Sequence, residues 1–277
     1  MNSIADTTSQ HPVGQAFMSA DELIDRLGTT PLTVLAVWAH PDDESLLAGG
    51  LLAGFARRGG RLVTVTATAG EHGLHDGRPA SPGRLAEVRV RELDEALNLL
   101  GGEPAIHLGY ADGECDQVSE HLAAHLIGRV IDDVDADLVI SFGPDGVTGH
   151  PDHRAVGRWV RRAVADRGDA TPLITVANHL VWSDRVIDGL DSIGAFWSGH
   201  PHRRPVGEPL VGVVVPLCRA LTTAKLAALW SHTSQVGPTA ATLGHDGLRA
   251  AAATEYFIAA NPPARRHLTQ ELAAIEP

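Results

Sequence analysis

The sequence predicts an α/β protein with a Rossmann-like, doubly wound, mostly parallel sheet and helices on both faces. Short apolar runs rich in valine and leucine, typical of buried parallel strands, alternate with longer segments of helical length. With 277 residues, 44% of them hydrophobic, the chain can build one sizeable core. We therefore expect a single domain over residues 19–277, preceded by a flexible arm at residues 1–18.

The first half of the domain alternates regularly between strands and helices. We expect strands at 32–39, 61–68, 105–108 and 137–142, and helices at 20–27, 45–58, 84–100, 117–134 and 150–166. Glycine pairs follow two of these helices, at 59–60 and 101–102, and are typical of helix C-termini. Residues 69–83 form a long loop between the second strand and the next helix.

The second half is less regular. Strands are expected at 173–181 and 210–215, a helix at 217–230, and a helix followed by a strand within 248–258. Residues 182–209 contain glycine, proline and histidine without any period, which indicates an insertion or a flap.

The composition of the chain indicates which kinds of partner it can bind and in which cell compartment it acts. A formal net charge of −12 argues against nucleic acid or an anionic membrane as the main partner. Cys115 and Cys218 imply no disulfide framework, the first residues do not resemble a signal peptide, and no apolar run reaches the length of a membrane span. We expect a cytoplasmic protein that acts on a small molecule, either as a monomer or as a homo-oligomer.

The first motif that carries chemistry is Ala39-His40-Pro41-Asp42-Asp43-Glu44, between a strand and a helix. A histidine and an aspartate three residues apart in a turn can both reach one metal ion, and imidazole and carboxylate are ligands expected of zinc. Asp42 remains beside the metal and could take a proton from a metal-bound water. The alternative is a solvated acidic loop that caps the helix N-terminus.

The second motif is His150-Pro151-Asp152-His153, which also lies between an expected strand and an expected helix. Because the carboxyl ends of parallel strands point to the same edge of a sheet, the two motifs can converge on one metal ion.

The two motifs, about a hundred residues apart, resemble the paired signature of the PIG-L/LmbE-like zinc-dependent N-deacetylases. The resemblance implies that His40, Asp43 and His153 bind one zinc ion per chain, although other divalent metals are possible. Three protein ligands leave a coordination position open for water, as catalytic zinc requires. The resemblance also implies that Asp42 is the general base. The alternatives are a structural metal or polar cluster, and an Asp42 that is an electrostatic spectator.

The family pattern assigns His150 a catalytic role near the substrate carbonyl, where a protonated imidazole would stabilise the oxyanion or protonate the leaving amine. Asp152 would accept a hydrogen bond from His150 and orient it, or else act only as a helix N-cap. By the same resemblance Arg89 binds a substrate hydroxyl or phosphate, its alternative being a surface pair with Glu92. Asp112 matches a loop at the rim of the site and would bind substrate, or would be part of a plain turn.

Some positions depart from the family pattern or stay unassigned. Thr148 stands where some thiol-pathway members carry a tyrosine, which puts a phenol contribution and membership of that subgroup in doubt. His121 and His125 share one helical face, but Glu120 precedes the first histidine, so the arrangement is not the His-Glu-x-x-His of a metal site, and a solvated surface is favoured. His232 resembles a C-terminal family segment, but its role does not follow from the sequence.

The resulting prediction is a zinc-dependent hydrolase that removes an N-acetyl or other N-acyl group from an amino-sugar-containing small molecule by metal-activated water. The alternative enzyme is an amidase that acts on a larger thiol conjugate or natural-product amide. A nucleotide-binding module would need Gly-x-Gly-x-x-Gly after the first strand, but carboxylates that repel phosphate occupy that position.

Overall fold

The computed structural model describes residues 15–28, 31–75, 78–177, 188, 192 and 212–269. Its main sheet contains β1 (Gln15–Phe17), β2 (Thr33–Trp38), β3 (Arg61–Thr66), β6 (Ile106–His107), β7 (Leu138–Phe142), β8 (Leu173–Val176), β9 (Gly212–Pro216) and β10 (Thr254–Ala259). A separate small hairpin pairs β4 (Leu74–His75) with β5 (Arg78–Pro79).

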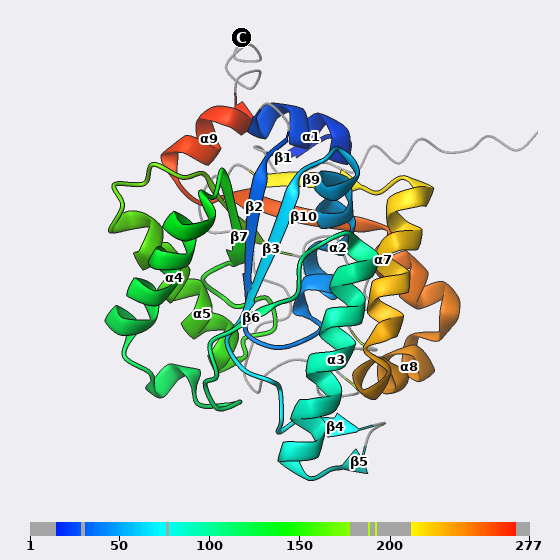
Figure 1. The fold of residues 1–277 in the computed structure, drawn as a ribbon. Coiled ribbons are helices and arrows are strands. Elements are labelled where there is room, and N and C mark those ends of the chain that lie inside the picture. Colours follow the sequence, from blue (N-terminus) through cyan, green and yellow to red (C-terminus); the bar gives the residue numbers. More distant parts are fainter. Residues whose placement is uncertain are drawn as a thin grey trace, which may run out of the picture.

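The eight strands lie in the order β1-β9-β10-β8-β7-β2-β3-β6 (Figure 1). Neighbours from β8 to β6 are parallel, β1 is parallel to β9, and β10 alone runs antiparallel to both of its neighbours. The predicted mostly parallel α/β fold is confirmed.

Helices cover both faces of this sheet. They are α1 (Ala20–Leu27), α2 (Asp43–Arg57), α3 (Pro82–Leu100), α4 (Glu120–Val134), α5 (Pro151–Ala165), α7 (Arg219–Ser231), α8 (Thr233–Ala252) and α9 (Pro262–Thr269). Helices α4 and α5 pack together on one side, whereas α2, α3 and α7 pack together on the other (Figure 1). None of the helices in these described ranges has the long apolar stretch that a bilayer span requires.

The strand order creates a switch point between β2 and β7. From β2 the chain moves outward to β3 and β6, and it then returns to the other side of β2 to form β7. In open α/β sheets, ligands bind beyond the carboxyl ends of the strands at such a point, because the following loops diverge and leave a crevice. Both histidine motifs follow these two strands.

Close packing of α2 against α7 and β10 fixes the helix that carries the first motif. A β-carbon on Gly50 would lie 2.2 Å from Cδ1 of Leu217, so any larger residue here would require the Leu217 side chain to move. The fully buried Glu255 accepts hydrogen bonds from the backbone N–H groups of Gly50 and Leu51 at 2.8 and 2.9 Å. Its charge is paired with Lys225, whose Nζ lies 2.8 Å away.

Two expectations change, and a third cannot be compared with the described residues. The arm expected at residues 1–18 includes β1, which pairs with β9 in the sheet, so the boundary was set too late. Helix α8 begins at Thr233, far before the expected helix near residue 248, although it contains Pro238 and is kinked at Gly244. The insertion or flap expected at 182–209 falls, apart from residues 188 and 192, outside the described residues.

Candidate metal centre and active site

The two motifs meet at the carboxyl ends of β2 and β7. Strand β2 ends at Trp38 and α2 begins at Asp43, so the first motif fills the turn between them. Strand β7 ends at Phe142, and His150 is the N-cap of α5. The predicted convergence of the motifs is therefore present.

The three predicted ligands lie close together, and Asp43 approaches each histidine through a different carboxylate oxygen. Nδ1 of His40 lies 3.1 Å from Nε2 of His153, and this Nε2 lies 3.4 Å from Oδ1 of Asp43. Oδ2 of Asp43 lies 3.8 Å from Nδ1 of His40. Tetrahedral zinc with bonds of about 2.0–2.1 Å separates its ligands by about 3.3 Å. The nearest contacts among the three side chains, 3.1–3.8 Å, are of this order, so the side chains are close enough to share one ion.

The outer nitrogens of the two imidazoles are already hydrogen bonded. Nδ1 of His153 lies 2.9 Å from the carbonyl oxygen of Gly146. Nε2 of His40 lies 3.1 Å from Oδ1 of Asp112 and 3.2 Å from Oδ2 of Asp152. Such acceptors hold the proton on the outer nitrogen and leave the inner lone pair for a metal, which is the usual arrangement of metal-binding histidine.

The site also has the electrostatics of a cation site. Burial opposes a charge on His40, but hydrogen bonds to Asp112 and Asp152 and the charge of Asp43 outweigh it and raise the pKa of His40 to about 10. Burial and the neighbouring charge on His40 lower the pKa of His153 to about 3. The carboxylates around His40 thus stabilise positive charge on this side of the site.

Other donor combinations share His40. Ring nitrogens of His40, His150 and His153 lie within 4.8 Å of one another, and so do donor atoms of His40, Asp112 and Asp152. The two aspartates contact the outer nitrogen of His40, which places them behind this ligand. His150 could therefore bind the metal ion in place of Asp43. The predicted ligand set of His40, Asp43 and His153 remains a prediction.

Asp42 occupies a strained turn. Its backbone has φ 115° and ψ −26°, a conformation that costs a non-glycine residue about 1–3 kcal/mol and that the surroundings must enforce. Its Oδ2 lies 3.1 Å from Nη2 of Arg89. Burial raises the pKa of Asp42 to about 6 even though the positive charge of Arg89 lowers it. A carboxylate with this pKa is suited to accept a proton near neutral pH.

Arg89 is buried and points into the site, so the alternative of a surface pair with Glu92 is wrong. Besides Asp42, Arg89 donates through Nη2 to the carbonyl oxygen of Pro41 at 2.5 Å and through Nη1 to that of Gly70 at 2.8 Å. A β-carbon on Gly70 would lie 2.1 Å from this Nη1, and the φ of Gly70 is +64°, so both constraints call for glycine. Substrate binding by Arg89 remains a prediction.

His150 and Asp152 differ from expectation in detail. Nδ1 of His150 accepts a hydrogen bond from the backbone N–H of Asp152 at 3.2 Å, whereas the Asp152 carboxylate contacts His40 and accepts from the N–H groups of Gly113 and Cys115. The Asp152 carboxylate therefore orients His40, contrary to the expected bond with His150. Burial, with the charges on His40 and His153, lowers the pKa of His150 to about 4, so the expected imidazolium is replaced by a neutral ring.

Asp112 is more enclosed than a residue at a site rim. Both of its carboxylate oxygens are engaged, Oδ1 with His40 and Oδ2 with the backbone N–H of His72 at 2.9 Å. Its own N–H donates to Oε1 of Glu71 at 2.9 Å. This environment favours support of His40 over the predicted substrate contact.

Sequence reasoning missed the pair formed by Glu44 and His232. Both side chains are fully buried, and Nε2 of His232 lies 2.8 Å from Oε1 of Glu44. Burial opposes the charge on each, but their mutual attraction lowers the pKa of Glu44 and raises that of His232. Glu44 was visible as the last carboxylate of the first motif, but no local signal links it to a histidine 188 positions away.

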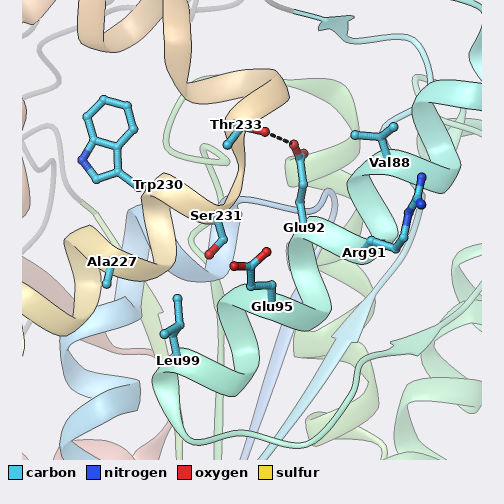
Figure 2. A pocket seen from close by; sticks show the side chains of 9 residues that line it. All are labelled: Val88, Arg91, Glu92, Glu95, Leu99, Ala227, Trp230, Ser231 and Thr233. Atoms are coloured by element: carbon cyan, nitrogen blue, oxygen red, sulfur yellow. Dashed lines mark hydrogen bonds between the residues drawn. The ribbon is translucent and has the colours of Figure 1, made fainter.

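A groove of about 450 Å³ between α3 and α7 is separate from this site. It is lined by Val88, Arg91, Glu92, Glu95, Leu99, Ala227, Trp230, Ser231 and Thr233 (Figure 2), which include none of the predicted metal ligands. At its edge, Oε1 of Glu92 accepts a hydrogen bond from the hydroxyl of Thr233 at 2.8 Å.

Comparison with known proteins places this geometry in a family. Residues 35–164 match the family model described as PIG-L, GlcNAc-PI de-N-acetylase. A 1D-myo-inositol 2-acetamido-2-deoxy-alpha-D-glucopyranoside deacetylase from Corynebacterium diphtheriae is 31% identical over 226 residues, 73% of this chain and 75% of the relative. This chain belongs to the PIG-L family. A Thermomonospora curvata protein with the same name is 29% identical over 85% of this chain and 93% of its own length.

Solved structures show the same fold. A deacetylase of the teicoplanin biosynthetic pathway has a TM-score of 0.60, with 19% identity over 82% of this chain and 96% of the other. An N,N'-diacetylchitobiose deacetylase from Pyrococcus horikoshii has a TM-score of 0.53, with 22% identity over 88% of each chain. The PIG-L match contains both histidine motifs but ends before α7, so His232 lies outside it.

Proposed function

We propose that this protein is a zinc-dependent hydrolase that removes an N-acetyl or other N-acyl group from an amino-sugar-containing small molecule. The observation that carries the proposal is the convergence of His40, Asp43 and His153, with nearest contacts of 3.1–3.8 Å, beside Asp42, a carboxylate whose pKa is raised. The names of the family and of its relatives support the reaction and the amino-sugar substrate.

Zinc held by the three ligands would supply Lewis-acid polarisation of the amide carbonyl and a lowered pKa for an attacking water. Asp42 is the group that accepts the proton of this water. Its pKa of about 6 leaves it ionised at neutral pH and still basic enough for the transfer. Once protonated, the same carboxyl group can return the proton to the leaving amine, which balances the hydrolysis to a carboxylate and a free amine.

His150 has the geometry of a neutral hydrogen-bond donor. Because its Nδ1 accepts from the N–H of Asp152, the ring proton resides on Nε2. A preorganised N–H group stabilises negative charge that develops on the carbonyl oxygen during attack, and it does so without carrying a full charge itself. The ring is half-buried and the more exposed of the three site histidines, which suits contact with a bound substrate.

The test is a panel of N-acetylated amino sugars and their conjugates, incubated with protein of measured metal content, in which released acid and released amine are both quantified. The proposal expects equal amounts of acetate and amine from at least one amino sugar, and loss of both with a chelator. Cleavage of larger conjugates alone would favour the alternative amidase. One solved neighbour is described as a zinc-inhibited form, so the panel is run over a range of zinc concentrations.

A further inference from the structure

The junction between α7 and α8 reaches the first motif through a single buried side chain. His232 lies at this junction, and its Nε2 is 2.8 Å from Oε1 of Glu44. The hydroxyl of Ser45 donates to the same Oε1 at 2.5 Å. Oε1 of Glu44 thus has two hydrogen-bond partners. Because this carboxylate is shielded from water, its hydrogen bonds are strong, and the loss of one would cost stability.

The other oxygen of Glu44 faces the predicted base. Oε2 accepts a hydrogen bond from the backbone N–H of Asp42 at 3.0 Å. This is the residue with φ 115°, a conformation that must be imposed by its surroundings. Two hydrogen bonds through one carboxylate therefore join His232 to the backbone of Asp42.

The junction is itself fixed to α3. Glu92 accepts hydrogen bonds from the N–H of Ser234 at 2.8 Å, from the hydroxyl of Ser234 at 2.6 Å and from the hydroxyl of Thr233 at 2.8 Å, the last of which is drawn in Figure 2. One turn earlier the same helix sends Arg89 to the carboxylate of Asp42. Helix α3 thus holds the side chain of Asp42 directly, through Arg89. It holds the backbone of Asp42 indirectly, through the junction, His232 and Glu44.

We propose that His232 is a positioning residue for Asp42: through Glu44 it holds the turn in which the Asp42 carboxylate meets Arg89. Among the described residues, the hydrogen bonds of the His232 ring are to Ser45 and Glu44 rather than to a predicted metal ligand, and Glu44 separates it from Asp42. The inference rests on the proposed function because it takes Asp42 as the base. It gives a role to a residue from beyond the matched family region.

The decisive variants are His232→Gln and His232→Asn. Both side chains end in an amide group, but the glutamine side chain is longer by one methylene. The glutamine amide can occupy the place of Nε2 and donate to Glu44, whereas the shorter asparagine amide cannot. We expect His232→Asn to lower kcat by about 10- to 100-fold, since small misplacements of a reacting group have effects of this size. KM and bound metal should stay near wild type, and His232→Gln should restore most of kcat.

Thr233→Val is the matched control, because it removes one hydrogen bond from the same junction, to Glu92 rather than to Glu44. Because Glu92 keeps both of its hydrogen bonds to Ser234, the junction stays attached to α3 and kcat should remain close to wild type. An equal loss of kcat in Thr233→Val and His232→Asn would show that general loosening of the junction is responsible and would overturn the proposal, as would a wild-type kcat in His232→Asn.

Crystal structures of wild type, His232→Asn and His232→Gln provide a readout that does not depend on activity. In His232→Asn we expect the backbone of Asp42 to relax from its positive φ and its carboxylate to lose the contact with Arg89. In His232→Gln we expect the positive φ and the contact to persist. An unchanged Asp42 turn in His232→Asn would overturn the inference. If the wild-type protein hydrolyses none of the amides tested, the proposed function is wrong, but these structures still decide whether His232 holds the Asp42 turn.

Discussion

Replacement of Arg89 by methionine should move the pH dependence of the reaction in a defined direction. Arg89 stabilises the ionised form of Asp42, so its removal raises the pKa of this carboxyl group above the wild-type value of about 6. The base must be deprotonated to act. The wild-type kcat/KM should therefore fall as the pH drops below about 6, and the fall should begin at higher pH in Arg89→Met.

The size of this change follows from the contact between Arg89 and Asp42. Unit charges 3.1 Å apart interact with about 1.3 kcal/mol at the dielectric constant of water and with about 5 kcal/mol at an effective value of about 20. One pKa unit corresponds to about 1.4 kcal/mol, which bounds the rise between about 1 and 4. Because Asp42 is partly exposed and solvent screens the pair, we expect the lower half of this range, a rise of about 1 to 2 pKa units.

The assay is kcat/KM for an N-acetyl amino sugar between about pH 5 and pH 10, with bound metal measured for each preparation. Arg91→Met is the matched control, because Arg91 is exposed on the same helix and donates to the carbonyl oxygen of Glu87. Its profile should match the wild type. An acidic limb at the same pH in Arg89→Met and wild type would refute the electrostatic role assigned to Arg89.

Three further variants test other parts of the structure. Asp42→Asn should keep the metal and lower kcat by about 10²- to 10⁴-fold, measured by acetate release, and near-wild-type turnover would make Asp42 a spectator. His150→Ala should leave metal content unchanged and lower kcat by about 10²- to 10³-fold, whereas a loss of metal would identify His150 as a ligand. Lys225→Met leaves the buried Glu255 unpaired and should lower the free energy of unfolding in urea by about 3–5 kcal/mol; an unchanged midpoint would contradict this pairing.

The sequence was most informative where function depends on neighbouring residues. His40 and Asp43 occupy one turn after a buried strand, and His153 follows a second strand, so local patterns located all three. The rule that parallel strands present their loops at one edge then brought them together. The structure places their donor atoms 3.1–3.8 Å apart.

Contacts across long stretches of sequence were beyond this kind of reasoning. Asp152 was expected to orient the nearby His150, but its carboxylate contacts His40, 112 positions away. The contact of His232 with Glu44 spans 188 positions. Such pairs depend on which strands become neighbours and on how helices pack, and a single sequence does not record either.

Helix α8 was missed for a local reason. It contains Pro238 and Gly244, residues that disfavour helix interiors, and its backbone departs from helical geometry at Gly244. Val236 and Leu248 pack with Leu229 of α7 in a small buried cluster, and Leu243 is also buried, which holds the segment in place despite this weak propensity. The antiparallel direction of β10 was also hidden, because the alternation of apolar residues carries no information on strand direction.

The measurement that tests the zinc hydrolase most directly is a metal titration of stripped wild-type protein, followed by acetate release from an N-acetyl amino sugar. A site made of His40, Asp43 and His153 predicts no turnover without metal and a linear rise that ends at about one zinc ion per chain. Full turnover by the stripped protein, or an activity that bears no relation to the first equivalent of metal, would contradict the proposed reaction.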